Sequence, residues 1–515
     1  MVKRGSITVF LALTLGLILS LLSSGLESVR MAAARTQILN GMDVGLYSLF
    51  GQYNKYLLKD YDLFAVDGAY GGKEMNLAAV YDNLESYMEP VMDQNSQKLS
   101  VQQGGISGYL LMTDADGEVF YQQAVQYMKE TLGSHGAALL LNKIRNTERK
   151  TTEAEKKGNE LEDKGTIESY ESEMNSAQEK SQAKLDEMTN NEQGTVDSSG
   201  FSDGTSSSGT GERYEPEPVD NPIPAIRRIR KMGILDLVIS PWKAISDKKA
   251  DKEKLVSGRN LEAGFAMEDS VKADCSITSQ ALYQQYLMEK LGNFINPGNG
   301  DLDYQIEYII AGKDNDEANL KAVANKLLRV REGINVAGLM ADPVKVAQVT
   351  SVAAAIAASF LIPPAAGVIK SALILCWAFA ESILDVRELF DGGKVPLVKN
   401  AVNWQLSLQN LPALFDSLDT IRRTDETGVS YEDYLQVFLF SCSKAKKIDG
   451  GMDMVETSVQ EAKNWNWFQL DHCITAMEVS ADVKANKRKT FTVTRAYHYI
   501  CLLYTSDAAD DKARV

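Results

Sequence analysis

A long uncharged apolar run near the N-terminus constrains this chain more than any other feature. Residues 7–26 contain no charged side chain, and 12 of these 20 positions are Leu, Ile, Val or Phe. A helix rises about 1.5 Å per residue, so the run matches a hydrocarbon core about 30 Å thick. We therefore expect residues 1–26 to be a basic leader followed by a transmembrane anchor in the lipid bilayer. The predicted anchor residues are Ile7, Leu11, Leu15, Ile18, Leu22 and Leu26.

Two basic residues, Lys3 and Arg4, precede the apolar run. Because positively charged flanks stay in the cytoplasm, they predict a single-pass protein with a cytoplasmic N-terminus and an extracytoplasmic bulk. Two alternatives remain open. The run could be a secretory signal cut near residues 23–25, although such a signal has only about 7–15 apolar residues. It could also be a buried helix of a soluble protein, although it lacks a polar face.

The sequence after the apolar run continues as a helix. Apolar residues recur at spacings of three and four, which predicts a stripe that packs on a head domain. The stripe consists of Leu39, Met42, Leu46, Leu49, Tyr53 and Tyr56. Gly41, Gly45 and Gly51 weaken a helix and predict a bend in this region.

Shorter patterns complete a first module. β-forming residues predict a strand over 61–66 and a second strand over 109–112. Apolar periodicity predicts helices over 77–92 and 120–143. Residues 27–145 are therefore expected to form an α+β module.

A polar stretch separates this module from the next. Residues 146–191 consist mainly of Glu, Lys, Asp, Ser and Gln, with too few apolar residues for a coiled-coil seam. A Ser/Gly-rich segment at 194–211 and a Pro-rich segment at 215–224 follow. We expect 146–224 to be a largely disordered linker.

The second expected module, residues 225–500, is mainly helical. Helices are predicted over 282–291 and 302–311, and a long helix starts at 314–317. The buried stripe of this long helix consists of Leu320, Val323, Leu327 and Val330. A further helix restarts at Asp342–Pro343, and Ser430 to Asp433 has the pattern of a capping box.

Two apolar stretches in this module, 347–368 and 371–386, could also span a membrane. Their alanine content, the intervening Pro363–Pro364 and the charge of Lys370 favour a buried helical pair instead. Strands over 473–480 and 490–497, joined by a basic turn, predict a C-terminal β-hairpin. Residues 501–515 resemble a translated sequencing-adapter tail, which we treat as non-native.

These patterns predict a helix-rich α+β protein. A long N-terminal transmembrane helix runs into an extracytoplasmic α+β head, followed by a mainly helical second module and a C-terminal β-hairpin. The net charge of −16 argues against a nucleic-acid partner, because phosphate contacts need a basic surface.

The sequence contains no catalytic signature and no cofactor motif. His472 and Cys473 are neighbours, but neighbouring side chains of a strand point to opposite faces. Cys442 and Cys473 could form a disulfide or remain thiols. The aspartates at 114–116 and 301–303 lack the further ligands of a calcium loop and are interpreted as turns. We therefore expect neither an enzyme nor a bound cofactor.

Several stretches carry a resemblance to known proteins. They are residues 3–11 with 26–30 and 33–35, residues 304–313, residues 380–387 with 392–397, and residues 431–435. Together they resemble an uncharacterised clostridial family of membrane-anchored proteins. The N-terminus is similar to the TadE/TadG minor pilin-like proteins of tight-adherence pilus systems.

The resemblance implies an accessory or minor pilin-like surface protein that acts by binding pilus or envelope proteins. It also implies leader cleavage between Gly5 and Ser6. Pilin-type precursors carry a glutamate five residues after the glycine, and this chain has Phe10 there. Two alternatives stay open: an exported envelope enzyme such as a cell-wall hydrolase, and a tethered ligand-binding protein.

Overall fold

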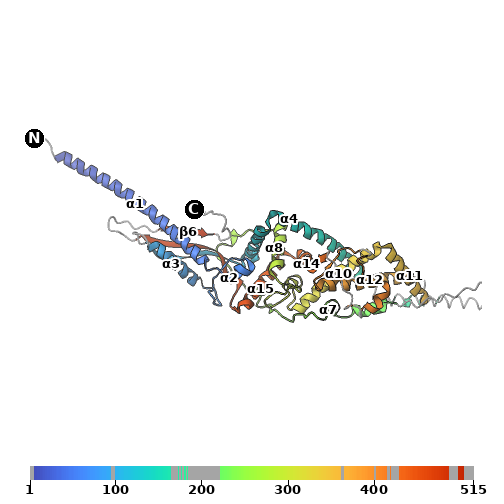
Figure 1. The fold of residues 1–515 in the computed structure, drawn as a ribbon. Helices are drawn as coiled ribbons and strands as arrows, with labels where there is room; N and C mark the ends of the chain where they lie inside the picture. Colours follow the sequence, from blue (N-terminus) through green and yellow to red (C-terminus); the bar gives the residue numbers. More distant parts are fainter. Residues whose placement is uncertain are drawn as a thin grey trace, which may run out of the picture.

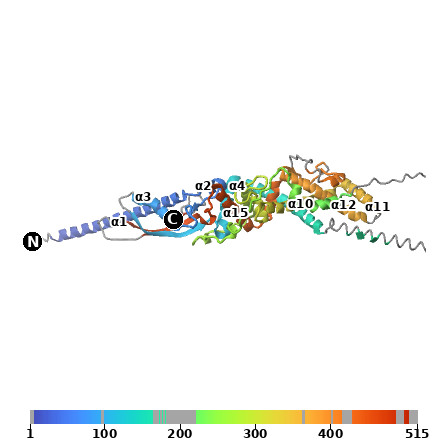
Figure 2. The same ribbon diagram turned by 90° about the horizontal axis from the view of Figure 1, so that it is seen from below.

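The computed structural model describes residues 5–93, 99–163, 221–360, 365–399, 402–414, 428–485 and 497–503, and isolated positions at 172–183 and 418. The protein is helix-rich, with a long apolar N-terminal helix and a few antiparallel strands. Figures 1 and 2 show an elongated molecule. Helix α1 projects from one end, and α10, α11 and α12 lie at the other.

Helix α1 (Gly5–Phe50) is one continuous helix of 46 residues. Its second half packs on α3 (Leu77–Asp93), which confirms Met42, Leu46 and Leu49 of the predicted stripe, whereas Tyr53 and Tyr56 lie beyond the end of α1. The buried side chains on the α1 side are Ala34, Ile38, Met42, Leu46 and Leu49. Those on the α3 side are Val80, Leu84, Met88 and Met92.

The bend predicted at Gly41 and Gly45 is wrong, because these glycines serve helix packing. A Cβ on Gly45 would lie 2.4 Å from Met88 Cγ, and one on Gly41 would lie 3.1 Å from Met92 Cε. Without side chains at these positions, α3 approaches α1 closely. Only Gly51 follows the end of the helix.

The strand predicted over 61–66 is also wrong. Tyr61 ends α2 (Lys55–Tyr61), and only Val66 belongs to a strand, β1 (Val66–Asp67). The Asn54 side chain accepts hydrogen bonds from the backbone N–H groups of Tyr56 and Leu57, at 3.0 and 3.2 Å. This N-cap stabilises the helix against the β preference of the aromatic residues.

The main sheet joins the two ends of the chain. Its central strand is β5 (Cys473–Ala485), which pairs antiparallel with β2 (Leu99–Leu111) on one edge. Along the other edge, β5 pairs with β1 and with β6 (Tyr497–Leu503). The predicted strand at 109–112 is thus the end of a longer strand.

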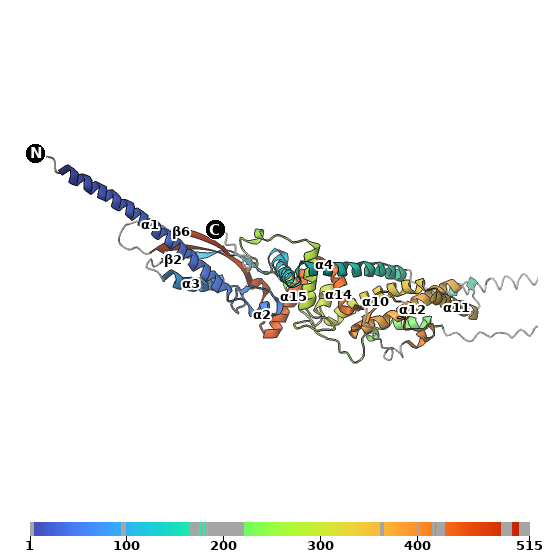
Figure 3. The same cartoon turned by 45° about the horizontal axis from the view of Figure 1, so that its top comes forward.

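The first strand of the predicted C-terminal hairpin is β5, whereas the second, 490–497, lies outside the described residues except for Tyr497, where β6 begins. Both β5 and β6 complete the N-terminal sheet, whose apolar side chains on β5 face α1 and α3. Figure 3 shows α1 lying along this sheet. Residues 486–496 lie outside the described part of the chain. So do 504–515, although 501–503 pair with β5 within β6.

The helical body forms one continuous core beyond the sheet. Its helices are α4 (Asp114–Asp163), α6 (Ile223–Arg230), α7 (Ile234–Val238), α8 (Ile277–Lys290), α9 (Gln305–Ala311), α10 (Asp316–Ala341), α11 (Pro343–Ser359), α12 (Ala366–Phe390), α14 (Tyr431–Phe440) and α15 (Lys444–Lys463). Short strands β3 (Lys394–Val395) and β4 (Val429–Ser430) pair antiparallel beside it. The 3-10 helices are η1 (Val256–Gly258), η2 (Glu268–Ser270), η4 (Leu408–Ala413) and η5 (Leu470–His472).

Helix α4 contains the predicted helix 120–143 but crosses the expected module boundary at 145. It changes direction at Gly133, where φ is +65°, and continues to Asp163. Thr151 in this extension is only 1% exposed, so the first part of the expected linker belongs to the packed body. The remainder of that segment, up to 220, lies largely outside the described residues.

The residues predicted to begin or end helices in the second module do so in the structure. Asn315 caps α10, and Asp342 caps α11 with Pro343 at its first turn. Gly312 ends α9 in a left-handed conformation, at φ +71°. Ser430 and Asp433 form the predicted capping box of α14.

Helix α12 is long and apolar enough to span a membrane, but 72% of its most apolar window is buried inside the protein. This confirms the expectation of a core helix there. Within the described residues, α10 and α11 would qualify only together, as one span bent by 91°. The Pro363–Pro364 pair that suggested the break lies outside the described residues.

Candidate functional site

The first candidate site is the apolar end of α1. The predicted anchor residues Ile7, Leu11, Leu15, Ile18, Leu22 and Leu26 are between 55% and 72% exposed. None of the most apolar window of this helix is buried, and its length suffices to span a membrane. Gly5 and Ser6 begin the helix, whereas Lys3 and Arg4 lie outside the described residues.

The second candidate site is organised by α15, whose inner face carries polar side chains in the core. Asp453, Glu456, Thr457 and Ser458 are each at most 4% exposed. Asp453, Glu456 and Ser458 bond to neighbouring segments, whereas the Thr457 hydroxyl donates to the Asp453 carbonyl within α15. For example, Asp453 accepts hydrogen bonds from the Ser257 hydroxyl at 2.7 Å and from the Tyr308 hydroxyl at 2.8 Å.

An ion cluster fixes the next turn of α15. Arg259 donates to Glu456 Oε2 at 2.9 Å and to Asp471 Oδ1 at 2.6 Å. Both acids are nearly fully buried, so their charges require this guanidinium. Burial raises the pKa of Glu456 and Arg259 opposes that rise. The cluster ties the segment after η1 to α15 and η5.

The loop that precedes α9 is held to α15 by Ser458. The Ser458 hydroxyl donates to the Asn299 carbonyl at 2.6 Å and accepts from Gln305 Nε2 at 2.8 Å. Glu461 also accepts a hydrogen bond from the Gly300 backbone. These contacts fix one wall of a cleft.

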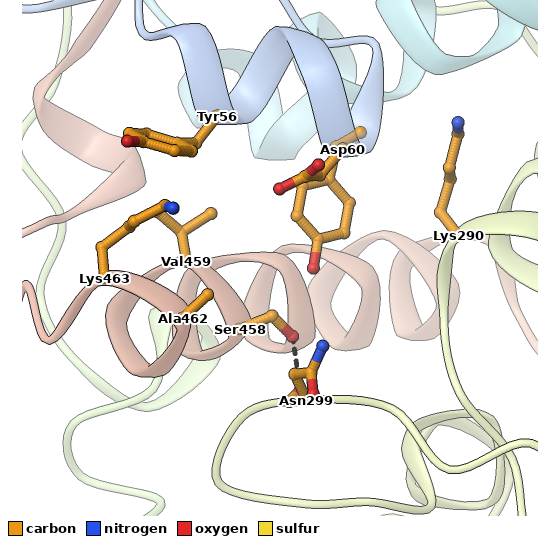
Figure 4. A pocket seen from close by; sticks show the side chains of 9 residues that line it. Tyr56, Asp60, Lys290, Asn299, Ser458, Val459, Ala462 and Lys463 are labelled. Atoms are coloured by element: carbon orange, nitrogen blue, oxygen red, sulfur yellow. Dashed lines mark hydrogen bonds between the residues drawn. The ribbon is translucent and has the colours of Figure 1, made fainter.

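The cleft, of about 180 Å³, lies between α2, α15, the end of α8 and this loop. Figure 4 shows Tyr56 and Asp60 on one side and Ser458, Asn299 and Lys463 on the other. The full lining is Tyr56, Asp60, Tyr61, Lys290, Asn299, Ser458, Val459, Ala462 and Lys463. It is smaller than the roughly 300–1,000 Å³ of pockets for drug-sized ligands.

Two lining lysines are held by the protein itself. Lys290 Nζ lies 2.6 Å from Asp62 Oδ2 and 4.7 Å from the centre of the Tyr127 ring. Lys463 Nζ lies 3.7 Å from the centre of the Tyr56 ring. Burial raises the pKa of the Tyr61 phenol, which therefore stays protonated as a hydrogen-bond donor.

The residues considered as chemical candidates from the sequence do not form a site. His472 and Cys473 are both buried, and burial raises the pKa of the Cys473 thiol well above its usual value. Cys275, Cys376, Cys442 and Cys473 form no disulfide among the described residues. In the described part of the chain, no group of three or more His, Cys, Asp or Glu side chains could hold a metal ion.

The expected turn at Asp114 is confirmed. Its carboxylate accepts hydrogen bonds from the backbone N–H groups of Leu111, at 2.6 Å, and Gly264, at 2.9 Å. Ala115, Asp116 and Gly117 all have positive φ, which forms the turn into α4. The carboxylate is thus used by the backbone.

The stretches 304–313, 380–387 and 431–435 meet within the body. Glu307 lies in the first stretch and accepts a hydrogen bond at 2.6 Å from the hydroxyl of Tyr431, which lies in the last stretch. From the second, Asp385 binds Arg331 at 2.7 Å and Lys399 at 2.5 Å, and all three side chains are buried. Glu381 is a further partner of Lys399. These polar groups hold helices together.

Sequence reasoning missed the cleft. Its lining residues come from α2, the end of α8, the loop before α9 and the C-terminal half of α15, and no motif links these segments. One signal was available: Asp453, Glu456, Thr457 and Ser458 of α15 are polar at positions where a helix of this length is expected to bury a face.

The fold and these sites define an elongated helix-rich protein with one fully exposed apolar helical end. The sequence profile of a family of unknown function, DUF5702, matches residues 212–485, just over half of the chain. The chain therefore belongs to this family. No curated protein and no solved structure matches the chain.

Proposed function

We propose that this protein is a single-pass membrane protein with a cytoplasmic N-terminus and an extracytoplasmic body that binds other envelope proteins. The observation that carries the proposal is the exposure of α1 on all sides. From Ile7 to Val29, large apolar side chains are 55% to 76% exposed, and only from Ala34 onward does one face pack on the protein. A helix that is apolar all round is favourable when lipid surrounds it.

The proposed partners are proteins of a tight-adherence pilus or of another envelope assembly, in a clostridial type of cell. The resemblance of the N-terminal residues to TadE/TadG-like minor pilins supports this choice. Phe10, in place of the pilin glutamate, favours an accessory role over incorporation into the filament. We also propose that Gly5 is the residue after which a leader would be cut.

The buried carboxylates favour binding over catalysis, because other groups of the protein already occupy them. Glu456, Asp453 and Asp385 are each bound to a guanidinium, a hydroxyl or an ammonium of the protein. A general acid or base needs a lone pair or proton that faces substrate. These carboxylates instead join segments of the body.

Protease added to wall-stripped cells tests the topology. The body should be degraded, while a cytoplasmic marker protein stays intact, and the anchor fragment should resist extraction at alkaline pH. A variant with Lys3→Glu and Arg4→Glu should lose part of this orientation, whereas Lys55→Glu and Lys59→Glu, which change the same number of charges on α2, should keep it. Full protection of the body in intact cells would refute the proposal.

A further inference from the structure

The cleft between α2 and α15 contains polar groups that the fold does not use. Asp60 and Asn299 are exposed, and no side chain in the described part of the chain forms an ion pair or a hydrogen bond with the Asp60 carboxylate or the Asn299 carboxamide. Ser458 and Lys290, by contrast, are occupied by protein partners. The free groups are therefore one carboxylate and one carboxamide.

The charges that face the cleft are balanced. Lys290 is neutralised by Asp62 at 2.6 Å. The remaining pair is Asp60, with one negative charge, and Lys463, with one positive charge that lies over the Tyr56 ring. A strongly anionic or cationic ligand would meet a like charge, so the balance favours a neutral ligand.

An aromatic wall continues from the cleft along the surface. Trp465 packs edge-on against Tyr56, with ring centres 5.1 Å apart. Trp467 stacks on Trp465, also at 5.1 Å. All three side chains are half-buried, so part of each ring remains accessible at the rim.

This combination fits one chemical class. A pyranose ring has a face of C–H groups, which packs on aromatic rings, and a rim of hydroxyls. Carboxylates and carboxamides bind such hydroxyls in pairs because each offers two polar atoms. The cleft volume of about 180 Å³ corresponds to roughly six waters of the liquid, at about 30 Å³ each, which suits one sugar unit.

We infer that this cleft binds a single neutral sugar residue, a hexose or an N-acetylhexosamine, at the end of a glycan whose next unit lies on Trp465 and Trp467. Asp60 and Asn299 hold the hydroxyls of this residue, while the Lys463 ammonium covers the Tyr56 ring. The inference concerns the cleft alone and stands or falls independently of the membrane topology proposed above.

Tryptophan fluorescence of the full chain in lipid nanodiscs tests the inference, because Trp465 lies at the rim and no sugar-headed detergent competes. The probes are N-acetylglucosamine tetramer, maltotetraose and, as the zwitterionic alternative, glycine and glutamate. We expect one of the two sugars to give a saturable change. Asp60→Ala and Asn299→Ala should each weaken its binding about tenfold or more.

The matched control is Asp82→Ala, which removes an exposed carboxylate from α3, away from the cleft. It should bind like the unmodified protein. Because Asp60 and Asn299 are exposed, their alanine variants should keep the far-UV circular dichroism of the unmodified protein. Saturation by the amino acids instead of the sugars, no saturation by either sugar, or unchanged sugar binding by Asp60→Ala would each overturn the inference.

Discussion

Replacing Glu307 by glutamine should remove the contribution of this carboxyl to the pH dependence of stability between about pH 4.5 and 7. Glu307 is 0% exposed, and its Oε1 accepts hydrogen bonds from the Tyr431 hydroxyl at 2.6 Å and the Phe294 backbone at 2.9 Å. Its Oε2 has no hydrogen-bond partner among the described residues. Burial raises the pKa of Glu307 from 4.5 to about 7.

The sign and size of the effect follow from this shift. The folded state holds the Glu307 proton more tightly than the unfolded state, so the stabilisation is complete below pH 4.5 and is lost as pH rises through about 7. At about 1.4 kcal/mol per pKa unit, a shift from 4.5 to about 7 corresponds to a loss of about 3.5 kcal/mol. A glutamine keeps the carbonyl acceptor and cannot ionise, so Glu307→Gln should be more stable than the unmodified protein above pH 7.

Urea denaturation of the full chain in neutral detergent micelles, followed by near-UV circular dichroism across this pH range, measures the difference. Glu253→Gln, which changes an exposed glutamate, is the matched control and should keep the pH profile of the unmodified protein. If Glu307→Gln retains that profile as well, or is less stable above pH 7, Glu307 is not a buried group that protonates near neutrality.

Three further variants or fragments test the packing, by the same denaturation assay unless stated. Lys399→Met leaves Glu381 and Asp385 buried without their ammonium and should cost about 3–5 kcal/mol, while Lys394→Met on the surface should cost little. Gly45→Ala places a Cβ against Met88 and should lower stability by about 1–2 kcal/mol even though alanine favours helix, while Gly25→Ala, with nothing within 4 Å, should not. A fragment of residues 225–500 lacks β2 and α4, and should be recovered as a soluble, folded species only when it is co-expressed with residues 27–163. Recovery of that fragment alone as a soluble, folded monomer would contradict the interlocked fold.

The sequence predicted helices well wherever a helix-capping residue or a regular apolar periodicity marks them. The Ser430–Asp433 capping box, the Asp342 N-cap and the stripe of α10 were all visible, because each depends on residues a few positions apart. The exposed apolar half of α1 was visible for the same reason. The strand predicted at 61–66 failed because the helix capped by Asn54 includes Tyr61, and the chain then turns through a left-handed Asp62 before β1 begins at Val66.

Long-range pairing could not be predicted in this way. Nothing in residues 473–485 indicates that their partner is 99–111, more than 350 positions earlier. The cleft was missed for the same physical reason, since Tyr56, Asn299 and Ser458 come together only after the body and the sheet have packed. Gly41 and Gly45 illustrate the limit at short range: a glycine that weakens a helix and a glycine that admits a neighbouring helix are indistinguishable until the neighbour is known.

The position of the cleft follows from the way the two ends of the chain are joined. The chain passes between the sheet and the body at several points, including 51–54, 112–113 between β2 and α4, and 470–473, and Lys290–Asp62 adds a side-chain contact beside α2. The body is therefore attached to α1 at several points rather than through one hinge. On the proposed topology, residues 26–50 raise the end of α1 at most about 36 Å above the membrane surface, at 1.5 Å per residue. A cleft held at that height by a rigid helix would reach polymers of the envelope while the anchor stays in the bilayer, which is the arrangement that a tethered glycan-binding site requires.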